Sequence, residues 1–401
     1  GLSEGFIKAG YNPIAHVEMD KAACYTLKTR TVYHYLKRIK KFDKYLSYLK
    51  GEITRSELYS SIPENVMSCV INLEMDDKNN GEIFNRIDRL LENKKVDLII
   101  GGPPCQAYSL VGRARSKDGM QSDPRNHLYL EYAKYLEKYN PKLFVFENVL
   151  GLQSADGGNY FEKMKISFKE LGYEVKDFLV NAKDFGVLQN RKRIILIGYK
   201  KELNFSILNL KANNNKDYHV KSVFEDLPKL QAGTGCDKFS YYAKPTNEYL
   251  NKSGIRNGID ILTQHVSRPH TEQDKEIYRI AIRQLEDGAR LNYASLPGRL
   301  KTHNNQHSFF DRFKVVNEEA EHSQTVVAHI SKDGHYYIHP DIKQNRSISV
   351  REAARLQSFP DDYYFEGVKE GSNRTAAFRQ VGNAVPPLVA NKVAKKIKDI
   401  L

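Results

Sequence analysis

Short apolar runs alternate with amphipathic stretches along the first half of the chain. The apolar runs predict strands at residues 14–17, 96–100, 142–146 and 193–199. Apolar side chains recur at helical spacing between residues 128 and 139 and again between 160 and 171, which predicts two helices with one buried face each. Strands that alternate with helices are typical of a parallel sheet with crossover helices. The pattern therefore predicts an α/β fold for this half.

The alternation ends near residue 200, where the chain becomes polar around the asparagine run 213–215. Order returns near the C-terminus, because Ser349 and Glu352 have the spacing of a capping box that begins a helix. A last amphipathic helix is predicted from about Pro387, and we expect it to pack on the first part of the chain. We therefore expect a first domain at 1–200, a second at 201–345, and a return segment at 346–401 that completes the first.

Composition narrows the class of protein. The 401 residues carry a formal net charge of +13, which favours a polyanionic partner and above all nucleic acid. The four cysteines have no metal-ligand spacing, so we expect free thiols and no metal site. No apolar run approaches the roughly 18 residues that a membrane span needs. These features predict a cytoplasmic protein that does not enter a membrane.

One cysteine lies where a parallel sheet presents ligands. The strand predicted at 96–100 leads into Gly101, Gly102, two prolines and Cys105. Ligands of open α/β sheets bind beyond the carboxyl ends of the strands. A thiol held there by a stiff turn could act as a nucleophile, whereas a lone cysteine is more often a small buried residue.

Two neighbouring segments carry charged groups to the same edge. The strand at 142–146 is followed by Glu147 and Asn148, and a carboxylate at the end of an apolar strand is costly unless it has a partner or a task. Arg191 and Arg193 alternate onto one face at the start of the next strand. Two guanidinium groups there could bind a carboxylate, a phosphate or a base edge, or they could form a surface ion-pair patch.

Five motifs together resemble a known family. They are GGPPCQAYS, ENV, QNRKR, RSISVREAARLQSFPD and RQVGNAVPP, in this order. This ordered set resembles the DNA cytosine-C5 methyltransferases of bacterial restriction-modification systems. The resemblance implies a Rossmann-like fold of the S-adenosylmethionine-dependent methyltransferases, a mixed sheet with helices on both faces, plus a smaller irregular target-recognition domain at 201–345.

The resemblance also implies a mechanism in which a cytosine leaves the DNA stack before it reacts. Cys105 would add to C6 of the flipped base, and Glu147 would engage N3 and the exocyclic amine. Arg193 would orient the base and Glu147, Arg191 would support the site, and Asn148 would help to fix the loop. A methyl group would then pass from S-adenosylmethionine to C5, with S-adenosylhomocysteine as the other product.

A cofactor pocket is implied by the same resemblance. Residues 1–9 look like the second half of the family's first motif, which in the family follows a strand and an aromatic-x-Gly-x-Gly turn. Either these elements lie ahead of Gly1, or the protein binds the cofactor poorly. Glu18 suits the ribose hydroxyls, although it could equally be a solvated acid at a strand end, and an acidic residue between 60 and 77 should meet the adenine amine. The full set implied for the pocket is Gly1, Leu2, Glu18, Met19, Pro103, Leu128, Asn383, Ala384 and Val385.

The expected partner is double-stranded DNA. The basic loop after Cys105 resembles the segment that closes over the flipped nucleotide, although it could be an ordinary flexible loop. Thr325 with Val326 resembles a Thr-Leu pair near the phosphate backbone, and the implied DNA contacts are Gln106, Ser109, Arg113, Arg125 and Thr325. The candidates for base recognition are Arg290, Arg299, Asn304, Asn305, Gln306 and Arg312.

Two other functions stay open at this stage. One is a catalytically inactive DNA-binding relative, and the other is a transfer-RNA cytosine-C5 methyltransferase, whose recognition domain would be smaller. We expect a monomer, with a cognate restriction endonuclease acting separately.

Overall fold

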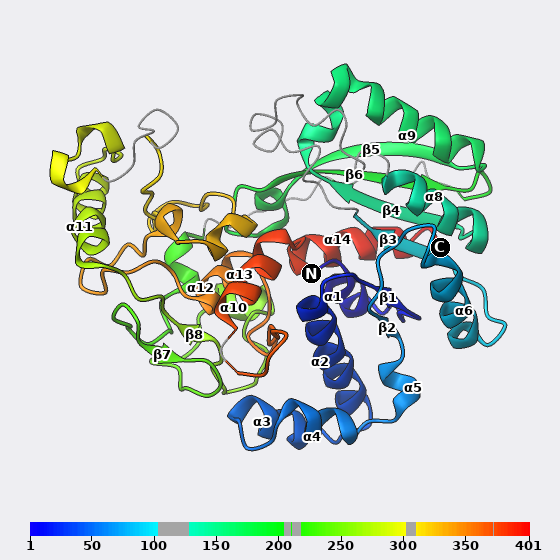
Figure 1. Ribbon diagram of the computed structural model, residues 1–401, viewed down its shortest axis with the longest axis horizontal. Helices are drawn as coiled ribbons and strands as arrows, with labels where there is room; N and C mark the ends of the chain where they lie inside the picture. The colour runs from blue at the N-terminus through cyan, green and yellow to red at the C-terminus, as the bar shows by residue number, and fades with distance from the viewer. Residues whose placement is uncertain (103–127, 204–209, 211–217, 302–309, 372) are drawn as a thin grey trace.

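The chain forms two parts that lie side by side (Figure 1), and we describe them from a computed structural model. It describes residues 1–102, 128–203, 210, 218–301, 310–371 and 373–401. One part contains the larger sheet with its helices, and the other contains the irregular segment that follows residue 218.

The larger sheet has four strands in the order β3-β4-β6-β5. Its strands are β3 (Leu98–Gly101), β4 (Leu143–Asn148), β5 (Glu174–Asn181) and β6 (Lys192–Tyr199). Strand β3 is parallel to β4, whereas β6 is antiparallel to both β4 and β5. The sheet is therefore mixed, as the family resemblance implied, and the wholly parallel sheet predicted from the pattern was wrong for β6.

Alternating side chains of β4 pack on two different helical layers. Leu143 and Val145 share a core cluster with residues of α1 (Leu2–Lys8) and α14 (Pro387–Lys398). Phe144 and Phe146 face the other way, toward α8 (Leu128–Tyr139) and α9 (Asn159–Glu170). Because successive side chains of a strand point to opposite faces, this apolar strand is buried on both sides. Helices on both faces of the sheet are thus confirmed.

A second, two-stranded parallel sheet joins β1 (His16–Val17) and β2 (Val70–Ile71). The helices that accompany it are α2 (Lys21–Arg38), α3 (Asp43–Lys50), α4 (Arg55–Ser60), α5 (Glu64–Met67) and α6 (Asn80–Leu91). Buried aromatic and aliphatic side chains of α2, α3 and α4 form one core cluster with Ile261 and Tyr364. This end of the first part therefore packs directly against the second part.

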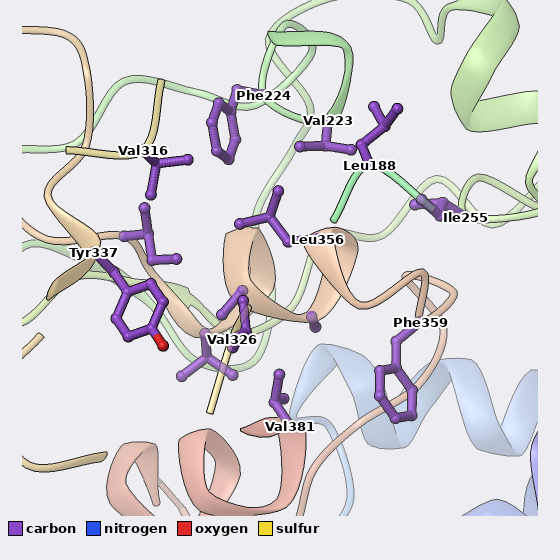
Figure 2. Close-up of a cluster of buried hydrophobic side chains, with 14 of the residues drawn as sticks. Leu188, Val223, Phe224, Ile255, Val316, Val326, Tyr337, Leu356, Phe359 and Val381 are labelled. Carbon is purple, nitrogen blue, oxygen red and sulfur yellow. The ribbon is translucent and has the colours of Figure 1, made fainter. Parts of the chain in front are cut away.

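The second part is mostly loops with short helices. Its elements are β7 (Gly235–Cys236), α10 (Glu248–Lys252), β8 (His265–Val266), α11 (Glu272–Glu286), α12 (Val350–Leu356) and α13 (Arg374–Asn383), with 3₁₀ turns that include Val220–Val223 and Ala328–Ser331. Figure 2 shows its core, where Leu356 lies among Val223, Val326 and Val381. One apolar cluster thus joins α12 and α13 to the irregular segment.

Several predicted elements are confirmed to within two residues. The four predicted strands correspond to β1, β3, β4 and β6, and the two helical patterns correspond to α8 and α9. Ser349 caps α12, since its side chain accepts a hydrogen bond from the Glu352 N–H while the Glu352 carboxylate accepts one from the Ser349 N–H. Helix α14 packs on α1, as expected for a returning helix.

Four strands of the described residues were missed. Strands β2, β7 and β8 have only two residues each, too few for a visible period. Strand β5 lies at the edge of its sheet with Lys176, Asp177 and Leu179 exposed, so its sequence lacks a continuous apolar run. Among the described residues, no helix has both the length and the apolar character needed to cross a membrane.

Candidate active site

An arginine–glutamate pair lies at the ends of two adjacent strands. Glu147 is the fifth residue of β4, and Arg193 is the second residue of the antiparallel strand β6. The Nε atom of Arg193 lies 2.9 Å from Oε1 of Glu147, and the two side chains are 17% and 14% exposed. A guanidinium held against one oxygen of a half-enclosed carboxylate fixes its orientation, and among the described residues no hydrogen bond to the second oxygen is found.

Arg191 lies deeper in the same site. Its guanidinium is fully buried and donates to the carbonyl oxygens of Val326, at 2.6 Å, and Gly382, at 3.1 Å. Arg191, Arg193 and Glu147 line one narrow pocket together with Val385 and Pro386. The two arginines therefore share a face, as their alternation predicts, and Arg191 binds two backbone carbonyl groups.

Asn148 and Gly102 shape the edge of this pocket. Asn148 is buried, and its Oδ1 accepts a hydrogen bond of 2.8 Å from the Val149 N–H, which holds the chain as it leaves β4. A Cβ atom at Gly102 would lie 2.6 Å from the Glu147 carbonyl oxygen and 3.0 Å from Glu147 Oε2. Only glycine fits there, so the chain after β3 starts directly beside the Glu147 carboxylate.

Several residues implied by the resemblance lie outside the described part of the chain. They are Pro103, Cys105, Gln106, Ser109, Arg113 and Arg125. Cys105 follows Gly102 by three residues in the sequence.

Thr325 reaches the site from the second part of the molecule. Its hydroxyl donates a 2.6 Å hydrogen bond to the carbonyl oxygen of Asn190, one residue before Arg191. The neighbouring Ser323 N–H donates to Leu188 O, and the Asn190 N–H donates to Ser323 O. Segment 323–326 therefore runs alongside residues 188–191, directly before β6.

Glu18 and Met19 follow β1 in the smaller sheet. The Glu18 Oε1 atom accepts a 2.9 Å hydrogen bond from the Asp20 N–H, and Asn72 donates to the carbonyl oxygens of Glu18 and Met19. Partial burial raises the pKa of the Glu18 carboxyl. Met19 is 57% exposed. The fixed carboxylate of Glu18 can accept hydrogen bonds from hydroxyl groups, and the exposed thioether of Met19 can lie against the apolar face of a ring. Together the two side chains fit a nucleoside.

The remaining cofactor candidates come from three places in the fold. Gly1 precedes α1, and a Cβ atom on it would lie 1.8 Å from the carbonyl oxygen of Val385, so α1 begins in contact with the turn after α13. Asn383 ends α13, and Ala384 and Val385 form that turn before α14. Leu2 and Leu128 are the first residues of α1 and α8, and both are half-buried.

The recognition candidates in the second part are engaged in ion pairs. Arg290 pairs with Asp311, Arg299 with Glu276, and Arg312 with Asp333. Asn304, Asn305 and Gln306, the polar residues between them, lie outside the described residues.

Two buried glutamines near the site were not singled out from the sequence. Gln189 and Gln357 are both fully buried and hydrogen bonded to one another. Their position within the motifs QNRKR and RLQSFPD is the sequence feature that could have identified them as site residues.

A larger cavity, of about 810 Å³, lies elsewhere. It is bounded by α1, α2 and the segment before β1, and Gly1 is the one predicted site residue in its described lining. Its lining includes Glu4, to which both Arg30 and His34 bind, and it shares no described lining residue with the Glu147–Arg193 pocket, so the two are separate.

Known proteins share both the sequence and the fold of this chain. The Type II methyltransferase M.Bpa9945I of Bacillus paralicheniformis is 41% identical over 436 residues, which cover 100% of this chain and 97% of the relative. M.DdeI of Desulfomicrobium norvegicum is 30% identical, over 99% of this chain and 86% of the relative. A prophage-encoded E. coli protein, assigned as a DNA modification methyltransferase, has a similar fold, with a TM-score of 0.65, 21% identity, and coverage of 100% of this chain and 95% of that one.

A model of the C-5 cytosine-specific DNA methylase family matches residues 70–399. That match includes the strand ends with Glu147 and Arg193, the segment with Thr325, and the turn at Ala384. Together with the full-length similarity to M.Bpa9945I, it establishes that the chain belongs to the C-5 cytosine-specific DNA methylase family.

Proposed function

We propose that this enzyme methylates C5 of a cytosine that has left the stack of duplex DNA, through a covalent bond to Cys105. The observation that carries the proposal is the Arg193–Glu147 pair beside Gly102, three residues ahead of Cys105. A nucleophile beside an oriented carboxylate matches the chemistry that the target demands, because C6 of cytosine accepts a thiolate only when electron density is drawn away through N3.

Cys105 is the proposed nucleophile. Its thiolate adds to C6 of the ring, and the electron pair of the C5–C6 bond moves toward C5. After methylation, a base removes the proton from C5, and the electrons of that C–H bond restore the double bond as the sulfur leaves. The thiolate is regenerated, so one Cys105 serves many turnovers.

Glu147 and Arg193 hold the base. Glu147 binds N3 and the exocyclic amine through the carboxylate oxygen that Arg193 leaves available, and a proton shared at N3 stabilises the charge that addition creates. Arg193 keeps the carboxylate in this orientation. Arg191 holds the backbone around it, and Asn148 fixes the chain as it leaves β4.

S-adenosylmethionine supplies the electrophilic methyl group when bound. Glu18 would bind its ribose hydroxyls, and Met19 would cover its adenine face. The contact of Gly1 with Val385 brings the start of α1 to the turn formed by Asn383, Ala384 and Val385, which would line the same pocket. Leu2, Pro103 and Leu128 are assigned to this pocket from the family resemblance.

Duplex DNA is the proposed substrate. A surplus of 13 positive charges favours a polyanion, and Thr325 lies beside the start of β6 where a strand backbone would pass the flipped base. Unstacking a base costs a few kcal/mol, which contacts from Gln106, Ser109, Arg113 and Arg125 would offset. The names of the relatives favour a modification enzyme of a bacterial restriction system. We therefore propose a cytoplasmic monomer whose cognate endonuclease acts separately.

Trapping on fluorinated DNA tests the chemistry. Duplexes that contain 5-fluorocytosine in many sequence contexts are incubated with the protein and S-adenosylmethionine. Fluorine cannot leave C5 as a proton does, so the working enzyme stalls as an adduct that survives denaturation. We expect this adduct with the natural chain and none with Cys105→Ala, and the trapped duplexes would identify the recognised sequence.

Two further variants test the carboxylate and its partner. Glu147→Gln is expected to lower kcat by about 10²–10⁴-fold because it removes the group that shares a proton at N3. Arg193→Lys replaces the guanidinium group that orients Glu147 and is expected to lower kcat less than Glu147→Gln does. The matched control is Arg86→Lys, because Arg86 also pairs with a glutamate, Glu82, but lies on the exposed surface of α6 away from the site. No adduct on any duplex from a folded protein that binds S-adenosylmethionine would refute the proposal and favour an RNA substrate or an inactive DNA-binding protein.

A further inference from the structure

Two chain segments far apart in the sequence are fastened to one another beside the active site. One is residues 325–326 of the second part, and the other is residues 381–384 at the end of α13. Arg191 donates one hydrogen bond to each, to Val326 O and to Gly382 O. A Cβ atom on Gly382 would lie 2.3 Å from the Val327 carbonyl carbon, so the two segments also touch through backbone.

A pair of glutamine amides joins the same two segments a second time. Gln189 Oε1 accepts the N–H of Val326 at 2.9 Å. Gln189 Nε2 donates to Gln357 Oε1 at 3.1 Å and to Leu356 O at 2.9 Å. Gln357 Nε2 in turn donates to Val381 O at 2.8 Å and Ala384 O at 3.3 Å. A continuous path of hydrogen bonds therefore runs from Val326 to Ala384.

This path has one consistent direction. Every amide nitrogen donates and every amide oxygen accepts, so turning either amide over would place two donors or two acceptors against each other. Both amides are fully buried, and their backbone partners Val326, Leu356 and Val381 belong to one apolar cluster, which Figure 2 shows. Hydrogen bonds in such surroundings are strong when complete and costly when broken.

We infer that Gln189 and Gln357 are positioning residues that set the distance between the DNA-side segment at Thr325 and the cofactor turn at Ala384. The inference rests on the proposed function, which assigns those two ends to DNA and to S-adenosylmethionine. Neither glutamine touches the reacting atoms. Their effect passes through the backbone of Val326 on one side and of Ala384 on the other.

Replacement of each amide by methionine tests this role. Gln189→Met and Gln357→Met keep side-chain length while removing the donor and the acceptor. We expect either change to raise the KM for S-adenosylmethionine by roughly tenfold, because a buried hydrogen-bonding partner is lost and the turn shifts. A merely structural loss would lower the amount of active enzyme and leave the KM of the remainder unchanged.

Gln264→Met is the matched control. Gln264 is also fully buried and also bridges two segments, through the N–H and carbonyl of Phe365, but it lies outside this path. The KM of Gln264→Met for S-adenosylmethionine should stay within twofold of the KM of the natural chain. An unchanged KM in Gln189→Met or Gln357→Met, or an equal rise in Gln264→Met, would overturn the inference.

Hydrogen exchange separates this inference from the proposed function. In Gln357→Met, the amide of Val326 should exchange roughly tenfold faster, although Gln357 does not bind it, because Gln189 loses its fixed orientation. Mass spectrometry of peptides that cover residues 323–327 measures this without cofactor or DNA. Unchanged exchange there would refute the path even in an active enzyme, whereas faster exchange in a chain without methyltransferase activity would refute only the proposed function.

Discussion

Burial keeps two histidines neutral. His265 Nε2 lies 2.8 Å from Pro228 O, and its Nδ1 lies 3.0 Å from the Ser349 hydroxyl, so a proton on Nε2 alone satisfies both contacts. Burial lowers the pKa of His265 to about 4 and that of His339 to about 3. Both side chains belong to the packing around the capping box of α12.

The lowered pKa values of these two histidines predict that the fold loses stability in weak acid. The unfolded chain takes up protons near pH 6.5 whereas the folded chain does not, so the free energy of unfolding falls as pH falls from about 6.5 toward 4. Between pH 7 and 5 the loss is about 2 kcal/mol for each histidine. Urea unfolding at pH 7, 6 and 5 measures it.

One variant isolates this effect from other titrating groups. In His339→Gln, the free energy of unfolding should fall less steeply between pH 7 and 5, because the contribution of one histidine is missing. The depressed pKa of the Glu352 carboxyl acts only at lower pH, because its contribution is lost below about 4.5. Burial raises the pKa of Glu366, so the titration of this group increases the free energy of unfolding as pH falls, opposite to the effect of the histidines. A slope in His339→Gln as steep as in the natural chain would contradict the assignment.

At the scale of elements, the crossing of α1 and α14 depends on one glycine. A Cβ atom on Gly5 would lie 2.4 Å from the Ala390 Cβ and 2.5 Å from the Asn391 nitrogen. The two helices therefore approach more closely than any side chain at this position would permit. Asn391 also donates to the Gly5 carbonyl oxygen across the contact.

Gly5→Ala is expected to destabilise the fold by about 1–3 kcal/mol, as overpacking of a tight contact does. Gly81→Ala is the matched control, since Gly81 also lies within a helix but a Cβ atom there meets nothing within 4 Å. That change should stabilise the fold by about 0.5–1 kcal/mol. Urea midpoints measure both. If both variants changed the stability in the same direction, helix propensity and not the close helix crossing would account for the effect of Gly5→Ala.

At the scale of the whole molecule, one buried arginine joins the two parts. Arg30 of α2 binds Glu4 of α1 at 2.7 Å and Asp362 of the C-terminal segment at 2.9 Å. Tyr45 of α3 donates to the Asp362 carbonyl oxygen, and Asn257 of the second part donates to its carboxylate. Five separate regions of the chain therefore meet at this point.

Arg30→Met should cost about 3–5 kcal/mol, because two carboxylates stay buried without their cation. Lys142→Met, which breaks the exposed pair with Asp97, should cost about 1 kcal/mol or less. Differential scanning calorimetry compares the two melting temperatures. A melting temperature in Arg30→Met as high as in Lys142→Met would mean that the arginine does not hold the parts together.

Much of this organisation was visible in the amino-acid sequence. The apolar runs located four strands because burial on both faces of a sheet requires them, and the Ser349–Glu352 spacing located a helix start. The ordered motifs predicted the family, and alternation predicted that Arg191 and Arg193 share a face. Local chemistry of this kind acts within a few residues, so the order of the amino acids is enough to reveal it.

Contacts between distant residues were decided only by the tertiary structure. Sequence spacing did not predict the antiparallel direction of β6 or the edge strand β5, because pairing depends on neighbours from elsewhere in the chain. Nor did it predict that Arg191 binds the carbonyls of Val326 and Gly382, or that Gln189 and Gln357 complete a path between them. The sequence alone determined which groups the protein carries, and folding determined which of them meet, since a buried polar group must find its partner wherever the packing places one.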